Sequence, residues 1–168
     1  MIDEMRLSDW EQVRQIYLDG IATGQATFET DAPTWMEWDE SHLKHSRLVA
    51  REDGRVIAWA ALAPVSRRRC YAGAAELSLY VSPEHRGKGL GKSLMQAVIE
   101  ASERNGIWSL SGSTFPENGA SIRLQKACGF RIVGRRVRIA QHHGIWRDTV
   151  LTERRSKVVG IVDTPTRT

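Results

Sequence analysis

The run "HRGKGLGKSL" over residues 85–94 has the composition of a loop that binds an anion. Its glycines carry no Cβ atoms, so successive backbone N–H groups are free to face a phosphate, and a helix that begins there adds the positive end of its dipole. A strand-like segment precedes the run and a helix-like segment follows it. We therefore expect the loop to bind a diphosphate or a similar anion.

Two nucleotide-binding motifs of similar composition do not fit the spacing. The Walker loop requires a glycine where Arg86 stands, although the end of that motif matches. The dinucleotide fingerprint Gly-x-Gly-x-x-Gly meets a lysine or a leucine at its third glycine, depending on where the count starts. The pattern that remains is Arg-x-x-Gly-x-Gly, from Arg86 through Gly89 to Gly91.

A carboxylate stands shortly before this loop. The segment "AAELSLYV" over 74–81 alternates as a strand does, with Glu76, Ser78 and Tyr80 on one side and Leu77, Leu79 and Val81 on the other. A carboxylate at such a place can accept a proton from a reacting group. On position alone, Glu76 is either such an acceptor or an exposed strand residue.

The composition is that of a globular protein. The chain has 168 residues, of which 26% are charged and 41% hydrophobic, and this fits one domain. No apolar run approaches the ~18 residues of a membrane span, and the N-terminus "MIDEMRLSDW" is too acidic and polar for a signal peptide. Cys70 and Cys128 show neither metal-binding spacing nor a disulfide framework. We expect a cytoplasmic protein without a membrane partner.

The net charge of +4 raises the question of nucleic-acid binding. Its best support is "SRRRC" at 66–70 and "RIVGRRVR" at 131–138. The second run lies in a strand-like segment, and neither a platform of stacking aromatic residues nor a recognition helix accompanies the basic residues. We therefore expect an anionic small ligand and no nucleic acid.

Periodicity and turn signals predict the element order β, α, α, β, β, β, α, β, α, β, β. Capping boxes at Ser8/Glu11 and Thr34/Glu37 are expected to start the first two helices, and Asp53-Gly54 to form a hairpin turn. The expected helices end near 23, 45, 105 and 128, and the expected strands are 2–7, two within 47–62, 74–81, 107–114, 130–140 and 145–153. Residues 155–168 show no periodicity and are expected to form a loose tail.

This order of elements and the Arg-x-x-Gly-x-Gly loop resemble the GNAT superfamily of N-acetyltransferases. The resemblance implies one α/β domain over 1–154, with a mixed, mostly antiparallel sheet flanked by about four helices. It implies acetyl-CoA as cosubstrate, with its diphosphate in the loop and its pantetheine arm along the end of the preceding strand. The cofactor-binding residues implied are Leu79, Tyr80, Val81, Arg86, Gly87, Lys88, Gly89, Leu90, Gly91, Lys92, Asn118 and Ser121.

Within the superfamily the chain resembles the phosphinothricin acetyltransferases and the related enzymes for methionine sulfoximine and arsinothricin. The resembling segments are "ATFETDAPT" at 26–34, "AELSLYVSPEHRGKGLGKSL" at 75–94 and "ENGASIRLQKACGF" at 117–130. The resemblance implies acetylation of the α-amine of a small glutamate-like amino acid by a homodimer. The alternatives are a protein or polyamine acetyltransferase, or an acyl-CoA-binding sensor without turnover; the triple arginine argues against a polyamine.

The resemblance also assigns catalytic roles. Glu76 matches a glutamate proposed as the base that takes a proton from the amine. A backbone N–H near Tyr80 or Val81 is expected to polarise the thioester oxygen. Many members place a tyrosine as acid where this chain has Gln125, which cannot supply a proton. The thiolate is therefore expected to leave unaided, or with a proton from water or from Tyr80.

The substrate residues follow from the charge of a glutamate-like molecule. Arg68 is the candidate clamp for a carboxylate or oxyanion, with Arg67 or Arg69 beside it, and the alternative is a solvated basic loop. The pocket is expected to be completed by Phe28, Glu29, Thr30, Tyr71, Glu76 and Ser78, although Phe28 equally suits a core position. His142 and His143 have no third ligand at a suitable spacing, so we expect turn residues and no metal.

Overall fold

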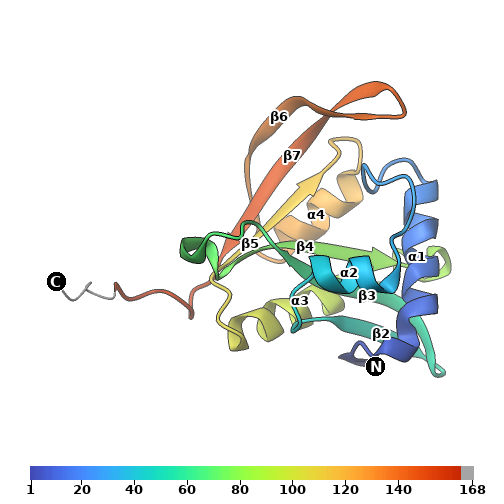
Figure 1. Ribbon diagram of the computed structural model, residues 1–168, viewed down its shortest axis with the longest axis horizontal. Helices are drawn as coiled ribbons and strands as arrows, with labels where there is room; N and C mark the ends of the chain where they lie inside the picture. The colour runs from blue at the N-terminus through green and yellow to red at the C-terminus, as the bar shows by residue number, and fades with distance from the viewer. Residues whose placement is uncertain (164–168) are drawn as a thin grey trace.

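The computed structural model describes residues 1–163, and the end of the expected tail, 164–168, lies outside the described residues. The described chain forms one seven-stranded sheet in the order β1-β2-β3-β4-β5-β7-β6, covered by helices on both faces (Figure 1). All neighbouring strands are antiparallel except β4 and β5, which are parallel. The expected mixed α/β fold is confirmed.

The strands are β1 Ile2–Glu4, β2 Leu48–Glu52, β3 Arg55–Pro64, β4 Ala74–Val81, β5 Ser109–Thr114, β6 Arg131–His142 and β7 Ile145–Arg155. The helices are α1 Trp10–Ala22, α2 Trp35–Ser41, α3 Leu90–Arg104 and α4 Gly119–Ala127. Short 3-10 turns are η1 Leu7–Asp9, η2 Arg69–Tyr71 and η3 Pro83–His85. The order of strands and α-helices along the chain is the one that the periodicity predicts.

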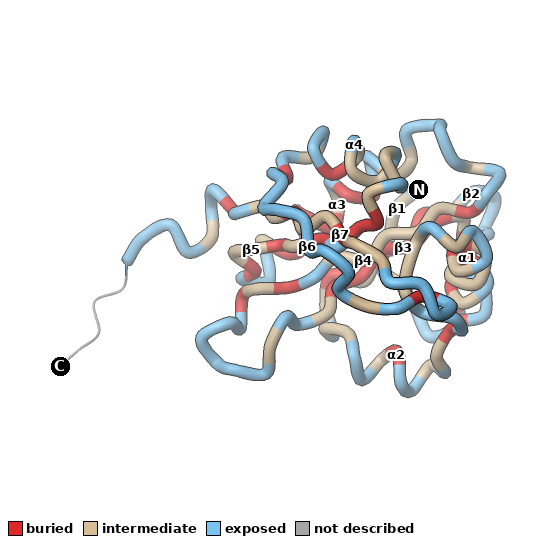
Figure 2. Tube along the Cα trace, turned by 90° about the horizontal axis from the view of Figure 1, so that it is seen from above, coloured by how far each residue is buried: buried red, intermediate tan, exposed pale blue. Residues whose placement is uncertain are grey.

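Two apolar clusters hold the layers together. On one face α3 packs its buried residues, among them Leu94 and Val98, against β2, β3 and β4, and α4 adds Leu124 to the same cluster. On the other face Trp10 of α1 and Trp35 and Trp38 of α2 pack in one cluster with Trp59 of β3. The central strands are accordingly the most buried part of the sheet, whereas β6 is exposed along nearly its whole length (Figure 2).

Local turn chemistry agrees with several predictions. Asp53 and Gly54 have φ values of 48° and 78° and join β2 to β3 in the expected hairpin. The capping box at α2 is present: Thr34 Oγ1 accepts from Glu37 N, and the Glu37 carboxylate accepts from Thr34 N at 2.8 Å. A capping box costs little to form and satisfies two otherwise unpaired backbone donors, which makes it visible in the sequence.

The prediction for the start of α1 is wrong. The residue before the helix is Asp9, not Ser8, and η1 precedes it. The Asp9 carboxylate accepts from Arg6 N at 2.7 Å and from both terminal nitrogens of Arg51 at 2.8 and 2.7 Å. A buried carboxylate needs such partners, and the charged one, Arg51, comes from β2, far along the sequence.

The second helix and the first strand are shorter than expected. Helix α2 ends at Ser41 rather than near His45, because His42 has extended backbone angles and Leu43 N donates to the Leu62 carbonyl at 2.8 Å. The segment after α2 is thus hydrogen-bonded to β3 instead of continuing the helix. Strand β1 ends at Glu4 and not at residue 7.

Residues 155–160 differ from the expected loose tail. Strand β7 continues to Arg155, whose guanidinium donates to the Val159 carbonyl at 2.8 Å. Ser156 is buried and its hydroxyl donates to Glu103 on α3 at 2.9 Å. These hydrogen bonds tie the segment to the domain. Within residues 1–163 no helix has both the length and the apolar character needed to cross a membrane.

Candidate active site

The sheet opens between its two parallel strands. Strands β4 and β5 pair only at Ala74–Ser109, Ala75–Leu110 and Glu76–Ser111. Beyond Glu76, β4 continues to Val81 along β3, while β5 continues to Thr114 along β7. The side of β4 over residues 77–81 that faces β5 therefore carries backbone groups without a strand partner, a ready edge for an extended ligand.

A cavity of about 870 Å³ occupies this opening. Its walls come from α1, the loop after α1, the end of α2, β4, the glycine loop, β5 and α4. Residues from all these segments, far apart in sequence, meet there. Of the expected site residues, the cavity is lined by Phe28, Glu29, Glu76, Ser78, Leu79, Tyr80, Val81, Arg86, Gly87, Gly89, Gly91, Lys92, Asn118 and Ser121.

The glycine loop leads from β4 into α3 at one end of the cavity. Gly87 and Gly89 have φ values of 74° and 81°, a region that side chains with a Cβ rarely occupy. Gly89 is the N-cap of α3, so the first two amides of the helix, those of Leu90 and Gly91, have no partner within the helix, whereas Lys92 N and Ser93 N donate to the Gly89 carbonyl. A Cβ on Gly91 would lie 3.2 Å from Leu124 and would narrow the space between α3 and α4.

Glu76 lies at the apex of the opening. Its carboxylate faces the α1 and α2 side of the sheet together with Ser78 and Tyr80, as the strand alternation predicts. It is open to the cavity, but the surrounding protein replaces much of its water, and this desolvation raises its pKa. The positive charge of Arg136 on β6 opposes the shift without cancelling it. The group is poised as a proton acceptor closer to neutrality than an exposed glutamate.

Tyr80 is held rigidly in the aromatic layer beneath α1. Its ring stacks on Trp59, with centroids 4.9 Å apart and an interplanar angle of 20°, and contacts Tyr17 at 4.9 Å. A Cβ on Gly20 would lie 2.6 Å from this ring, so α1 needs glycine there. Burial raises the pKa of Tyr80 well above its ordinary value, and the hydroxyl keeps its proton at neutral pH.

Gln125 fills the place on α4 where a tyrosine acid was considered. Its amide nitrogen donates to Thr114 at 2.9 Å and to Ser121 at 3.0 Å, and its oxygen accepts from Thr152. The side chain is buried, and an amide has no proton to release in this pH range. Gln125 is a fully hydrogen-bonded link between α4, β5 and β7.

The sequence profile of the acetyltransferase (GNAT) family matches residues 9–130, which is most of the chain and includes α1, β4, the glycine loop and α4. The chain belongs to the GNAT acetyltransferase family. It is 31% identical over 157 residues to the phosphinothricin N-acetyltransferase of Alcaligenes faecalis, and the matched residues cover 89% of this chain and 79% of that protein. It is 29% identical over 153 residues to the L-methionine sulfoximine/L-methionine sulfone acetyltransferase of Pseudomonas aeruginosa, with 88% and 89% covered.

A solved structure shares the arrangement. The crystal structure of a GNAT-superfamily phosphinothricin acetyltransferase from Sinorhizobium meliloti, in complex with acetyl-CoA, superposes with a TM-score of 0.88 at 26% identity. The match covers 98% of this chain and 92% of that one. The seven-stranded sheet and its four α-helices thus form a GNAT acetyltransferase fold within residues 1–163, and this chain is an N-acetyltransferase of that family.

Several expected residues of this GNAT domain lie outside the cavity lining. Lys88 is exposed in the glycine loop, and Leu90, the first residue of α3, packs against the core. Thr30 is exposed in the loop between α1 and α2. The basic segment between β3 and β4 holds the others: Arg67, Arg68 and Tyr71 are exposed, and the Arg68 guanidinium lies 5.7 Å from the centre of the Tyr71 ring.

The loop after α1 is fastened over the cavity by contacts that the sequence does not reveal. Arg147 on β7 donates to the Gly24 carbonyl at 2.8 Å and to Gln25 Oε1 at 2.9 Å. Asn118, expected to bind the cosubstrate, donates to the Gln25 carbonyl at 3.2 Å and accepts from Ser121 N at 3.2 Å. Since nothing in the local pattern marks Arg147 as different from the other arginines of the last hairpin, sequence reasoning missed it.

Aromatic contacts of Phe28 and His142 also hold the loop after α1 in place. The Phe28 ring packs edge-on to Phe115 with centroids 4.8 Å apart, and His142 contacts both rings. His142 is buried at the end of β6, which corrects its expected role as a turn residue, whereas His143 with φ 50° lies in the turn. Among residues 1–163, no group of three or more His, Cys, Asp or Glu side chains is arranged to hold a metal ion.

Proposed function

We propose that this enzyme transfers the acetyl group of acetyl-CoA to the α-amine of a small glutamate-like amino acid of the phosphinothricin, methionine sulfoximine or arsinothricin type. The observation that carries the proposal is the place of Glu76 at the apex of the opened strands, inside a cavity of about 870 Å³. A cavity of that size suits a pantetheine arm and one small substrate. The relatives named for phosphinothricin and methionine sulfoximine support the substrate class.

The residues that line the opening fit acetyl-CoA. The free amides at the start of α3 and the glycines at 87, 89 and 91 suit its diphosphate, with Arg86 and Lys92 adding positive charge. Arg86 is already oriented, since its Nε donates to the Val81 carbonyl at 3.1 Å. The unpaired edge of β4 over 79–81 suits the amide groups of the pantetheine arm. The bound cosubstrate would supply an acetyl group activated as a thioester.

Side chains and backbone groups of the enzyme would carry out the proton transfers and stabilise the developing charge. An amino acid reaches the site as an ammonium ion, which has no lone pair with which to attack. Glu76 takes a proton from it, directly or through one water, and an acceptor so placed contributes ~10²–10⁴ to the rate. A backbone N–H near Tyr80 or Val81 stabilises the charge that develops on the acetyl oxygen. The thiolate leaves unaided or takes a proton from water or from the Tyr80 hydroxyl, because Gln125 has none to give.

The substrate's anionic groups would meet cations at the far end of β4 from the glycine loop. Ala63 of β3 pairs with Glu76, and the basic segment begins just beyond Pro64. We propose that Arg68, with Arg67 and Tyr71 beside it, binds the substrate carboxylate or side-chain oxyanion, while Phe28, Glu29, Thr30 and Ser78 complete the pocket. Arg68→Ala should raise KM for the amino acid, whereas Arg131→Ala, on the exposed β6–β7 hairpin, should not.

We also propose that two copies associate. Strand β6 is an exposed sheet edge that carries Ile132, Val133, Val137 and Ile139 at the surface, the third of them 71% exposed. Exposed apolar edge strands are uncommon unless another chain covers them. Sedimentation velocity would show a dimer of the intact chain and a shift to monomer for Val137→Glu; a monomer at all concentrations would refute this part of the proposal.

A panel of amines assayed by thiol release tests the substrate class. Phosphinothricin, arsinothricin and methionine sulfoximine should release coenzyme A at rates that saturate with substrate. Spermidine and a short peptide serve as comparisons for polyamine and protein acetyltransferases. Turnover of those two alone would overturn the proposed substrate class. Binding of acetyl-CoA without turnover of any amine would indicate a sensor instead.

A further inference from the structure

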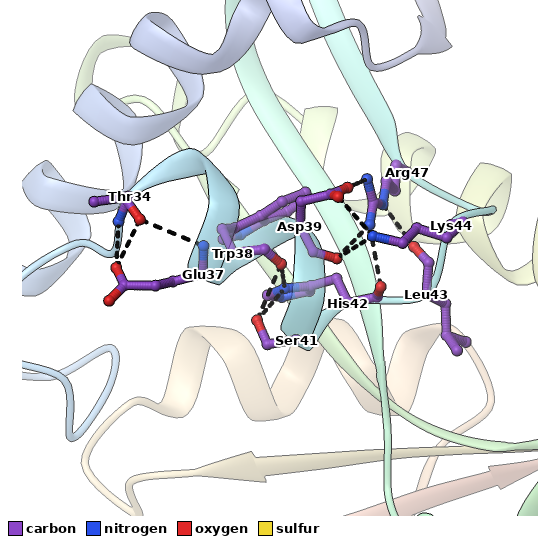
Figure 3. A network of polar contacts seen from close by, with 9 residues as sticks. All are labelled: Thr34, Glu37, Trp38, Asp39, Ser41, His42, Leu43, Lys44 and Arg47. Atoms are coloured by element: carbon purple, nitrogen blue, oxygen red, sulfur yellow. Dashed lines mark hydrogen bonds and ion pairs between the residues drawn. The ribbon is translucent and has the colours of Figure 1, made fainter.

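The cavity has a histidine in its wall that the reaction just described does not use. His42 is the first residue after α2 and lines the same cavity as Glu76. Its ring stacks on Trp38 with centroids 4.2 Å apart and an interplanar angle of 18° (Figure 3). The histidine is therefore held in one orientation by the tryptophan layer. No spacing in the sequence relates His42 to the glycine loop or to Glu76.

Hydrogen bonds fix which nitrogen of His42 carries the proton. Nδ1 lies 2.7 Å from the Trp38 carbonyl oxygen, and a carbonyl oxygen only accepts, so Nδ1 must be the donor (Figure 3). In a neutral imidazole the other nitrogen is then unprotonated. Nε2 consequently offers a lone pair, which can accept a hydrogen bond or a proton.

The strand register brings His42 to the side of the sheet where Glu76 acts. Leu43 N bonds the Leu62 carbonyl, and the Leu43 side chain packs into the α3 cluster. Because the backbone at His42 is extended, its side chain points to the opposite face, the one that bears Trp38 and Glu76. Strand β3 alone separates the two residues, so their backbones lie about 10 Å apart, two strand spacings. On this face β3 presents Ala63, whose methyl group leaves room for both side chains to converge.

The surroundings keep His42 neutral. Burial lowers its pKa, and the nearby charge of Arg47 lowers it further, while the hydrogen bond to Trp38 and the charge of Asp39 oppose the shift. Arg47 lies 5.0 Å from the centre of the Trp38 ring and pairs with Asp39 (Figure 3). The other titratable groups that line the cavity on this side are Glu76 and Tyr80 on β4, Tyr17 on α1 and Glu29 in the loop after α1.

The proposed acetyl transfer removes a second proton from the substrate nitrogen, which such a group could accept. An ammonium nitrogen carries three hydrogens and the nitrogen of the product amide carries one, so two protons leave while the N–C bond forms. Glu76 can hold only one of them at a time, and over the whole reaction one proton ends on the sulfur of coenzyme A while the other is released to solvent. We propose that His42 is a second proton acceptor of the site, whose Nε2 takes the other proton from the substrate nitrogen, directly or through one water. The imidazolium that results returns its proton to solvent. This inference rests on the proposed function.

The variant His42→Asn tests the role, because its amide can still donate to the Trp38 carbonyl while the acceptor at Nε2 is gone. We expect kcat/KM for phosphinothricin at pH 7 to fall by ~10². The acid limb of the pH profile should lose one ionisation relative to the unmutated enzyme, and acetyl-CoA affinity by calorimetry should not change. His45→Asn is the matched control, since His45 bonds Ser46 in the same loop and lies outside the cavity lining. A His42→Asn enzyme with the unmutated rate and acid limb would overturn the proposal.

Nitrogen NMR of the unmutated protein gives a second readout that needs no variant to fold. At pH 7 we expect a neutral His42 with the proton on Nδ1, and a shift of the Nε2 signal on adding the amino acid in the presence of coenzyme A. An imidazolium, or a proton on Nε2, would contradict the proposal even if the enzyme is active. Absence of turnover with every amino acid tested would refute the proposed function instead, a result distinct from either.

Discussion

Glu76 and Ser111 form the last residue pair between β4 and β5, and the sheet opens immediately beyond them. The carboxylate therefore lies at the apex of the opening, where the space for an extended ligand along β4 ends. Glycine amides lie at the other end of the same strand, before α3. One strand thus sets the separation between the glycine loop and Glu76, and under the proposed function the reacting end of acetyl-CoA bound along it would lie beside the carboxylate.

Replacing Glu76 by Gln keeps the size of the side chain and removes the proton acceptor. We expect kcat to fall ~10²–10³ at neutral pH while the Kd for acetyl-CoA stays the same. Because desolvation by the surrounding protein raises the pKa of Glu76, the activity of the unmutated enzyme should decline with acid at a higher pH than a fully solvated glutamate would give. Glu100→Gln, on the exposed side of α3, is the control. Equal kcat values for the Glu76→Gln and unmutated enzymes would show that Glu76 is not the base.

Glycine at position 89 is required by its φ of 81°, and under the proposed function its backbone also approaches the diphosphate of acetyl-CoA. Gly89→Ala should lower stability by ~1–2 kcal/mol through the left-handed conformation and should also weaken acetyl-CoA binding. Gly54→Ala imposes a similar strain at φ 78°, but in the β2–β3 hairpin, outside the cavity lining. It should cost similar stability and leave binding intact. Calorimetry and thermal unfolding of both variants separate the two effects; equal binding by both would contradict the anion site.

An element of the fold can be predicted from the sequence where the interactions that form it lie between residues close together in the chain. Alternation in β4, the Thr34–Glu37 capping box and the Asp53-Gly54 turn each predict their structure, because the interactions lie within a few residues. The predictions for the start of α1 and the end of α2 are wrong because interactions with residues distant in sequence determine both positions. Arg51 donates hydrogen bonds to Asp9 before α1, and Leu43 N, after α2, donates to the Leu62 carbonyl. Strand position and the family resemblance together single out Glu76, and its role as base stays a prediction. The positions of His42 in the cavity wall and of Arg147 against the loop over the cavity could not be predicted, because only the folded chain brings them there.

The buried pair of Asp9 and Arg51 should govern stability in acid. Hydrogen bonds from Arg51 hold the pKa of Asp9 below its ordinary value. The stabilisation is therefore present above the unfolded pKa of about 4 and is lost as pH falls through the folded value. Asp9→Asn should cost about 3 kcal/mol at pH 7, and this cost should shrink towards pH 3. Urea unfolding at several pH values measures it, with the exposed Asp31→Asn as control. A cost that does not change with pH would refute the role of this pair.

Arg147 should matter for substrate binding although it does not line the cavity. Its guanidinium lies 3.7 Å from the centre of the Phe115 ring and fastens the loop at Gly24 and Gln25 that leads to Phe28. Arg147→Gln should raise KM for the amino acid about tenfold, a loss of ~1.4 kcal/mol, with a smaller effect on kcat. Arg135→Gln, which removes an exposed pair with Asp148 on the same hairpin, should leave both constants unchanged. If the two variants behave alike, the loop does not depend on Arg147.

A single-turnover reaction with mass-spectrometric detection tests the central claim most directly. Enzyme in excess is mixed with acetyl-CoA and phosphinothricin, and the product is mapped by fragmentation. We predict one acetyl group on the α-nitrogen, formed at least a hundredfold more slowly by Glu76→Gln. An unmodified amino acid after prolonged incubation with the unmutated enzyme, or equal rates for the two enzymes, would contradict the account.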